Sequence, residues 1–463
     1  MLDKTTAQDV LFEAISLGAD FCDIFVERHQ SKNIQVLSSK VHEIKSGIDF
    51  GIGVRLIYGT KVLYGYTNSI EKEELIRITR LLAASEKRNA VRDTTVLNFS
   101  KIDDIHPATQ GINNDIPNQN KIDFLMSIDQ AARAHHEKVE QVRLGAGQRL
   151  QDVEIFNSEG LHTKDTRHYT RLFSMVMAAH EGEQATGYEA PGALTGWEMS
   201  QTIDPKQLGE MVAKQAITKL FADPCPSGKM PVVLDNGFGG VIFHEACGHL
   251  LETTSVQKKA SVFWDKMGET IANPCVSAVD DGTMGNYWGS INIDDEGMPT
   301  QKTQLIKDGV LTGFLVDKVG NLKTGHPRSG SGRKESYKYA PASRMRNTFI
   351  EPGKDSFDDM IASIDHGVYC KKMGGGSVQP GTGEFNFAAN ESYLIKNGKI
   401  DKPLKSATLI GTGPEVLKEI SMISSNLELA AGMCGSVSGS VPTTVGQAAL
   451  KIDNILVGGQ ANG

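Results

Sequence analysis

Two stretches in the first half of the chain repeat the same order of predicted elements, and this order limits the fold more than any other sequence feature. In the first stretch, apolar residues at helical spacing predict helices over Thr6–Leu17 and Glu71–Ser85, with strand-like segments between them. In the second stretch, the corresponding helices are predicted over Lys121–His135 and Gln207–Phe221. This order predicts an α+β fold with an internal repeat.

The strand-like segments between these helices complete the repeat. They fall at Phe21–Arg28, Asn33–Leu37, Gly53–Ile57 and Lys61–Tyr64 in the first stretch, and at Glu140–Leu144, Leu150–Phe156 and Thr170–Ala178 in the second. Gly187-Tyr188 takes the place in the second stretch that Gly65-Tyr66 takes in the first. We therefore predict two α-β4-α units, about residues 1–87 and 119–221, joined by a polar linker over about residues 88–120.

The character of the sequence changes after Pro224-Cys225-Pro226, where glycine becomes frequent and hairpin signals multiply. Asp308-Gly309 and Asn397-Gly398 each lie between strand-like runs and suit the positive φ angles of tight turns. We predict a boundary near residue 222, which divides the chain into an N-terminal α+β domain (1–221) and a C-terminal domain (222–463). The second domain should be a glycine-rich mixed or antiparallel sheet with a few helices.

Composition and charge exclude several classes of protein. The net charge of −8 at pH 7 argues against a direct nucleic-acid partner, which needs a dense basic face. No uncharged apolar run approaches the roughly 18–20 residues that span a bilayer, and the first residues lack the charges and apolar run of a signal peptide. We therefore predict a cytoplasmic protein with no membrane partner. In a reducing compartment, the six scattered cysteines are expected to be buried hydrophobes, ligands or nucleophiles rather than disulfides.

One short motif carries chemistry. A predicted strand over Met230–Asp235 and a glycine-rich turn precede a predicted helix over Val241–Glu252, in which His244 and His249 enclose Glu245 in an H-E-x-x-x-H pattern. The zinc motif H-E-x-x-H places its histidines four residues apart on one helix face. A spacing of five separates them by roughly 140° on a regular helix. We therefore predict a distorted turn between the two histidines, such as a single i→i+5 turn, if they share one ion.

Two histidines do not complete a metal site. Catalytic zinc usually takes three protein ligands and keeps one position open for water. Cys434, between glycines near the end of the chain, and Cys247, within the motif itself, are the candidates for the third ligand, and sequence physics leaves both open. Glu245 follows the first histidine directly, so its carboxylate is expected beside the ion, where it can take a proton from the bound water.

Three weaker features receive structural interpretations. The acidic runs Asp280-Asp281-Gly282 and Asp294–Gly297 are predicted to be turns rather than cation sites. The glycine-rich segment 374–383 is interpreted as a sheet edge that another backbone can approach. Residues 325–334 are interpreted as a mobile loop, with a lid over the site as a further hypothesis.

At this point the chain resembles the TldD/PmbA family of zinc metallopeptidases, also called modulators of DNA gyrase, over essentially its whole length. The motifs that carry the resemblance are His244–His249, Asp280–Thr283, Ile293–Gly297, Pro341–Thr348 and Gly432–Gly435. The resemblance implies one zinc ion per chain held by His244, His249 and Cys434, with Glu245 as the catalytic base. It also implies extended, unfolded peptides as substrates. Because the metal motif is intact, the chain resembles the TldD-type subunit, which works as a homodimer or beside a PmbA/TldE-like sister subunit.

The leading prediction is therefore a zinc-dependent peptidase. Two alternatives stay open at this stage. One is a non-catalytic scaffold or regulatory subunit that retains a structural metal in a closed four-ligand site. The other is a metal-dependent hydrolase of a non-peptide amide. His and Cys ligands suit zinc, although the residues alone do not distinguish it from other divalent metals.

Overall fold

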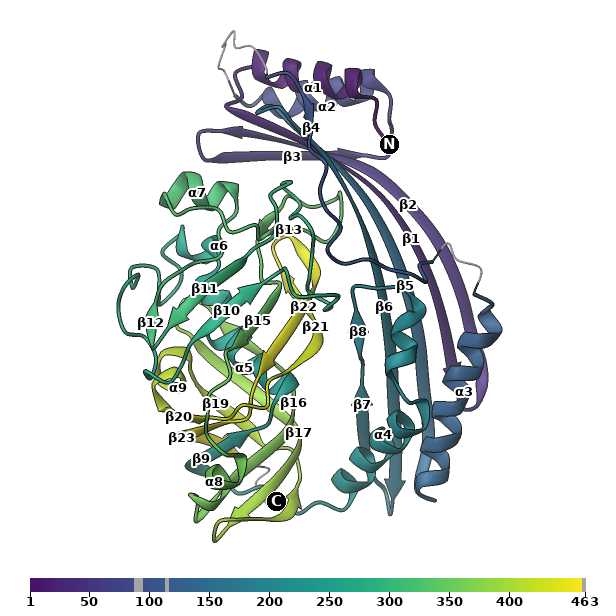
Figure 1. Ribbon diagram of the computed structural model, residues 1–463, viewed down its shortest axis with the longest axis vertical. Coiled ribbons are helices and arrows are strands. Elements are labelled where there is room, and N and C mark those ends of the chain that lie inside the picture. The colour runs from purple at the N-terminus through teal and green to yellow at the C-terminus, as the bar shows by residue number, and fades with distance from the viewer. Residues whose placement is uncertain (87–94, 113–115, 460–463) are drawn as a thin grey trace.

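The computed structural model describes residues 1–86, 95–112 and 116–459. It is a mixed α/β structure in which one long, curved sheet forms the N-terminal part and several shorter sheets form the C-terminal part (Figure 1). None of the helices in these ranges is long and apolar enough to cross a membrane.

In the N-terminal part, a helix, a set of strands and a second helix follow one another twice. Its elements are α1 (Lys4–Ser16), β1 (Phe21–Leu37), β2 (Lys40–Tyr58), β3 (Lys61–Thr67), α2 (Lys72–Ala83), β4 (Asn98–Phe99), α3 (Asn118–His135), β5 (Val139–Asn157), β6 (Leu161–His180), β7 (Glu183–Glu189), β8 (Gly192–Ala193), a 3-10 turn (Trp197–Thr202) and α4 (Pro205–Leu220). The sheet has the order β3-β2-β1-β5-β6, and β4, β7 and β8 also pair with β6. The four predicted helices are thus present to within a few residues.

The predicted division into strands is wrong, because β1 and β5 each cover two of the predicted strands. The first unit has three strands, β1–β3, and the second has four, β5–β8, of which β8 is only two residues long. The polar residues after Arg28 were expected to interrupt the first strand, but His29 pairs with Asp49 on β2 and with Gln151 on β5. Backbone hydrogen bonds on both sides keep such a segment extended whatever its side chains are. Gly145 in β5 likewise lies within the ladders to β1 and β6. That one ancestral unit was duplicated stays a prediction.

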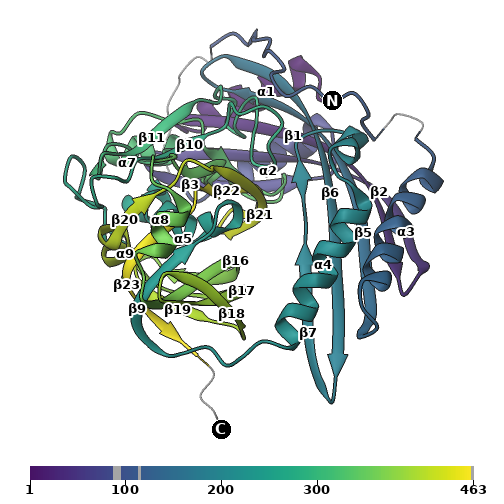
Figure 2. The same ribbon diagram turned by 60° about the horizontal axis from the view of Figure 1, so that its bottom comes forward.

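All four long helices lie on one face of the sheet. In Figure 1, α1 and α2 lie at one end of the sheet, and Figure 2 shows α3 and α4 along β5 and β6 at the other. Each pair packs over its own hydrophobic cluster. Gly65 on β3 and Gly187 on β7 have equivalent roles: a Cβ on Gly65 would touch Ile78 of α2, and a Cβ on Gly187 would overlap the backbone of Val212 in α4. A side chain at either position would hold the helix away from the strand.

The predicted linker crosses the sheet instead of lying free. Residues 88–94 and 113–115 of the predicted range lie outside the described residues. In the part that the structure describes, β4 pairs in parallel with β6, and Leu97 and Ile112 are buried. The linker is therefore attached to the rest of the chain at a few buried residues, while most of its residues over 95–110 are exposed.

The C-terminal part contains a closed, barrel-like sheet and an open sheet. Its elements are β9 (Gly228–Leu234), a 3-10 turn (Gly237–Gly240), α5 (Val241–Ala246), a second 3-10 turn (Gly248–Leu251), α6 (Thr253–Val256), β10 (Ala278–Asp281), β11 (Lys302–Lys307), β12 (Val310–Leu311), α7 (Lys318–Thr324), β13 (Gly332–Arg333), β14 (Ala342–Ser343), β15 (Asn347–Ile350), α8 (Phe357–Ala362), β16 (His366–Gln379), β17 (Glu384–Lys396), β18 (Lys399–Leu404), β19 (Thr408–Thr412), α9 (Gly413–Glu419), β20 (Ile420–Ile423), β21 (Glu428–Ser436), β22 (Gly439–Gln447) and β23 (Leu450–Gly458). The strands β16, β9, β23, β19 and β17 close on themselves through the β16–β17 pairing, and the open sheet has the order β12-β11-β10-β15-β22-β21.

Turns and the glycine-rich segment in this part both follow the sequence-based expectations. Asp308 and Asn397 have φ angles of 48° and 50°, as expected for the tight turns between β11 and β12 and between β17 and β18. The sheet edge expected over residues 374–383 agrees with the described pairings of β16: Gly376–Gln379 pair with β17 alone, whereas β9 pairs only with Val368–Cys370. Gly374-Gly375 form a bulge in the ladder between β16 and β17. Glycine is frequent there because the irregular ladder brings backbones close together.

Ion pairs hold the two parts of the chain together. Arg55 on β2 pairs with Glu296 at 2.8 Å, and Arg167 on β6 pairs with Asp295 at 2.7 Å. All four side chains are buried. The acidic run that contains Asp295 and Glu296 is thus a structural contact, in agreement with its interpretation as a turn rather than a cation site.

The mobile loop and lid proposed for residues 325–334 are wrong for the second half of this segment. Ser331, Arg333 and Lys334 are buried, and β13 pairs with β14. The backbone of Lys334 donates to Asp295, and its ammonium group lies over the ring of Phe25 in β1. Gly330 and Gly332 allow close packing within the C-terminal part, because a Cβ on either would overlap Pro299 or Glu296. The same frequent glycines had suggested a flexible loop.

Candidate metal centre

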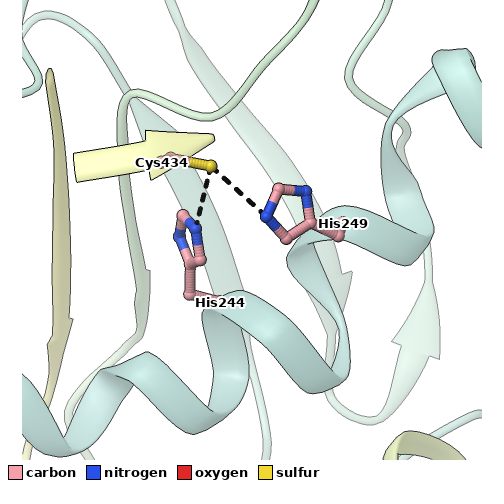
Figure 3. Close-up of side chains that lie close together, drawn as sticks. All are labelled: His244, His249 and Cys434. Carbon is pink, nitrogen blue, oxygen red and sulfur yellow. Dashed lines mark hydrogen bonds between the residues drawn. The ribbon is translucent and has the colours of Figure 1, made fainter. Parts of the chain in front are cut away.

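His244, His249 and Cys434 come together from two distant segments of the chain (Figure 3). His244 lies in α5 and His249 in the 3-10 turn after it, whereas Cys434 lies on β21. The Sγ of Cys434 is 3.3 Å from the Nε2 atoms of both histidines. The three ligand atoms all lie within 4.8 Å of one another.

A break in the helix brings the two imidazoles together. The α-helix ends at Ala246, and Cys247 has φ −134° and ψ −51°, outside the helical region. The chain then continues as a 3-10 turn, so the distortion is a break rather than the i→i+5 turn suggested from the spacing. The ring centroids of the histidines are 5.0 Å apart. Gly248 follows the break, and a Cβ there would overlap the Sδ of Met345.

The donor set fits a zinc ion. Ordinary Zn–N and Zn–S distances in a tetrahedral site place nitrogen and sulfur about 3.6 Å apart, close to the two separations at Cys434. Burial alone would raise the pKa of the Cys434 thiol, but His244 and His249 outweigh it and hold that pKa well below its usual range. The thiolate is the form of cysteine that binds metals.

Cys247 has a different environment. It lies in the hydrophobic core of the C-terminal part, and burial raises the pKa of its thiol above the ordinary value. Of the two cysteines that sequence physics left open, the structure therefore brings Cys434 to the histidines and leaves Cys247 among apolar side chains.

The carboxylate of Glu245 lies beside this cluster. Its Oε2 atom is 3.8 Å from Nε2 of His249, and the side chain is 20% exposed. Within residues 1–86, 95–112 and 116–459, no hydrogen-bond donor occupies this carboxylate. It is thus close to the ligand atoms, partly open to solvent and available to accept a proton.

Two buried side chains that the sequence interpretation missed support the cluster. The Nδ1 atom of His249 lies 3.0 Å from Oε2 of Glu252, which is 2% exposed. Arg344 donates to the backbone oxygens of Cys434 and Gly439 and so fixes the hairpin of β21 and β22. The sequence could have indicated Glu252 through its position three residues after His249, because residues at that spacing lie on the same face of a helix.

The strand that carries Cys434 is at the edge of its sheet and borders a cavity. Among the described strands, β21 pairs with β22 alone. A cavity of about 390 Å³ is lined by Leu429–Met433 of β21 and, across from it, by Arg171 and Tyr188–Gly192 of the N-terminal part. Gly374-Gly375 of β16 also line this cavity. Cys434 thus directly follows the β21 residues that line a space between the two parts of the chain.

Comparisons with known protein families agree with this architecture. Three PmbA/TldD domain models match the chain: PmbA/TldA metallopeptidase domain 1 over residues 22–86, the central domain over 112–220 and the C-terminal domain over 227–459. The Metalloprotease TldD homolog of Haemophilus influenzae is 37% identical over 451 residues, covering 95% of this chain and 93% of that protein. The Zinc metalloprotease TldD homolog of Saccharolobus solfataricus is 25% identical over 451 residues, covering 96% of this chain and 98% of that protein.

Solved structures share the fold over almost the whole chain. A Thermotoga maritima protein proposed to modulate a DNA gyrase superposes with a TM-score of 0.79 at 20% identity, covering 98% of this chain and all of that one. TldE from Thermococcus kodakarensis superposes with a TM-score of 0.74 at 18% identity, covering 98% and 99%.

Proposed function

The chain belongs to the PmbA/TldD family of metallopeptidases, and we propose that it is a zinc-dependent peptidase that hydrolyses extended or unfolded peptides. The observation that carries the proposal is the meeting of two imidazoles and one thiolate beside a free carboxylate. Relatives named metalloproteases support the hydrolase class, and a relative named a zinc metalloprotease supports the choice of metal.

His244, His249 and Cys434 would hold the ion, one per chain. When bound, zinc supplies a Lewis acid that polarises a carbonyl group and lowers the pKa of water. Glu245 accepts the proton of the attacking water and returns it to the leaving amine. Within the described residues, the cluster has three ligand side chains, which supports an open position for water rather than a closed structural site.

The edge of β21 supports an extended substrate. A peptide that adds to an edge strand binds through its main chain, which gives affinity with little sequence preference. The cavity is lined by Leu429–Met433 of this strand, and Cys434 is the next residue along β21. An unfolded peptide can enter such a space as a single strand, whereas a folded domain cannot expose its backbone in this way.

A second subunit is part of the proposal. The likeness in fold to TldE supports either a homodimer or a pair with a TldE-like sister chain. Light scattering of the purified chain, with and without a sister subunit, distinguishes these two assemblies. The cytoplasmic location stays a prediction.

The direct test of the activity is the Glu245→Gln variant. It should keep its zinc and its fold, and its hydrolysis of an unfolded protein such as casein should fall by about 10²–10⁴-fold, the usual contribution of a general base. Glu210→Gln on the exposed surface of α4 is the matched control and should retain full activity. Unchanged turnover in Glu245→Gln would refute the assigned role. A zinc-loaded wild type that cleaves small amides but no peptide would favour the non-peptide hydrolase instead.

A further inference from the structure

Two arginines on one face of β6 have opposite environments. Arg167 and Arg171 are four residues apart, so both side chains point toward the C-terminal part. Arg167 donates to the carboxylates of Asp165 and Asp295 at 2.9 and 2.7 Å. Arg171 has no carboxylate partner and no side-chain hydrogen bond within the described part of the chain. One buried cation is neutralised, and its neighbour along the strand is not.

The pKa shifts of the two groups reflect this difference. Burial lowers the pKa of Arg171, and the only neighbouring group that raises it is the phenol of Tyr188. Burial acts in the same direction on Arg167, but Asp295 and Asp165 more than offset it, so that its pKa rises. Arg171 is thus a partly desolvated charge with no counterion among the residues that the structure describes, which is costly unless a bound ligand supplies one.

Packing fixes the position of Arg171 relative to the strand that carries Cys434. Its guanidinium carbon lies 5.3 Å from the ring centroid of Trp288, a cation–π distance. Trp288 is buried, and its Nε1 donates to the backbone oxygen of Gly432 at 2.8 Å. Gly432 is two residues from Cys434 on β21. A Cβ on Gly192 would lie 2.9 Å from Trp288 and 3.3 Å from Arg171, so this stack depends on a glycine.

The surroundings of Arg171 are positive in a chain that is negative overall. Arg171 lines the cavity beside β21 and also a second cavity of about 370 Å³, where Arg143 is the other cation. Among the described residues that line these two cavities, Glu189 is the only acid, and it is already paired with Lys372. An anionic group that enters here meets cations without a competing carboxylate.

We infer that Arg171 binds a carboxylate of the peptide substrate, so that the enzyme prefers peptides with an acidic side chain or a free C-terminus close to the cleaved bond. The guanidinium fork matches a carboxylate in two parallel hydrogen bonds. The inference rests on the proposed function, because it places the substrate along β21. It adds a determinant of specificity to a binding mode that otherwise depends on the main chain.

The test measures binding rather than cleavage. Zinc-loaded Glu245→Gln protein binds fluorescent Ala/Ser decapeptides in which one Glu, or one Gln in its place, is moved along the sequence, each with a free or an amidated C-terminus. We expect one carboxylate-bearing peptide to bind about tenfold more tightly than its neutral counterpart, the scale of one charge-assisted hydrogen bond. The Glu–Gln comparison reports a side-chain carboxylate, and the acid–amide comparison reports a terminal one.

Substitutions at Arg171 then assign the preference. Adding Arg171→Gln should reduce it to less than about twofold, whereas adding Arg143→Gln, the matched change in the second cavity alone, should leave it intact. Arg171→Lys keeps the charge but not the fork, so it should retain part of the preference. It replaces Arg171→Gln in this test if that variant proves unstable. Equal binding of charged and neutral peptides, or a preference that survives Arg171→Gln or is fully kept by Arg171→Lys, would overturn the inference. Wild type that cleaves peptides without preference refutes only this inference, whereas a preference without cleavage refutes only the proposed activity.

Discussion

The carboxylate of Glu252 orients one of the three candidate ligands, so Glu252→Gln should weaken zinc binding without unfolding the protein. A carboxylate only accepts hydrogen bonds, which assigns the proton of His249 to Nδ1, 3.0 Å from Glu252. This leaves the lone pair of Nε2 directed at Cys434. The Gln oxygen can still accept the bond, but without a charge it makes the imidazole a weaker ligand.

The expected magnitude follows from burial. Partners of metal-bound histidines typically contribute 10–100-fold to affinity. Glu252 is 2% exposed, so water does not replace the lost charge, and Arg344 lies 3.8 Å from its other oxygen. We therefore expect zinc affinity to fall by about tenfold or more, equivalent to ~1.4 kcal/mol. Competition against a chromophoric chelator measures this change directly.

Glu245→Gln is the matched control for this experiment. Its carboxylate approaches the same imidazole, at 3.8 Å from Nε2, but makes no hydrogen bond to Nδ1. Its zinc affinity should therefore stay within about twofold of wild type, since it does not orient the ring. Glu252→Gln protein that binds zinc as tightly as wild type, with the same melting temperature, would refute the reasoning.

Three further outcomes test the site and the packing around it. Cys434→Ser should lose most of its zinc by elemental analysis, whereas Cys247→Ser should retain it because that thiol lies in the core; the reverse pattern would identify Cys247 as the ligand. In zinc-free protein, the rate of alkylation of Cys434 by iodoacetamide should have its pH midpoint below the ordinary thiol range. The reason is that the two histidines hold the pKa of this thiol low, so the thiolate persists as the pH falls. A midpoint at or above about 8.5 would contradict this. Glu296→Gln should lower the free energy of unfolding in urea by about 3 kcal/mol, because it removes the charge of a buried partner of Arg55. Glu74→Gln, in an exposed helical ion pair, should leave the midpoint of urea unfolding unchanged. Equal effects of the two substitutions would contradict the role of burial.

Local signals in the sequence were sufficient for helices and tight turns. The helices of the N-terminal part needed only apolar spacing, and the turn at Asn397-Gly398 needed only a residue pair that tolerates positive φ. Strands were harder, because the polar run after Arg28 and the glycine at 145 are held extended by neighbours far along the chain. Long-range pairing of this kind leaves no mark in local composition.

The candidate site shows the same division between local and long-range information. The spacing of His244 and His249 was enough to predict a distorted helix between them. The third residue of the cluster was chosen through resemblance to a family, which the domain models confirm, and not through physics, because nothing local links position 434 to the motif. Glu252 and Arg171 act through contacts that only folding creates.

The ion pairs between the two parts of the chain connect the fold to the site. Arg167 is anchored to Asp295 of the C-terminal part, and Arg171 lies four residues further along the same strand, about 13 Å away at the usual rise of a strand. The stack of Arg171 on Trp288 and the bond from Trp288 to Gly432 attach that strand to the C-terminal part a second time, at β21. Two contacts on one face of β6 thus join it to the C-terminal part, and Arg171 in the second contact lines the cavity beside β21. Loss of Asp295 removes the first of these contacts, which lies outside the cavity. It should therefore weaken peptide binding, and we expect KM for peptides to rise before the zinc content falls.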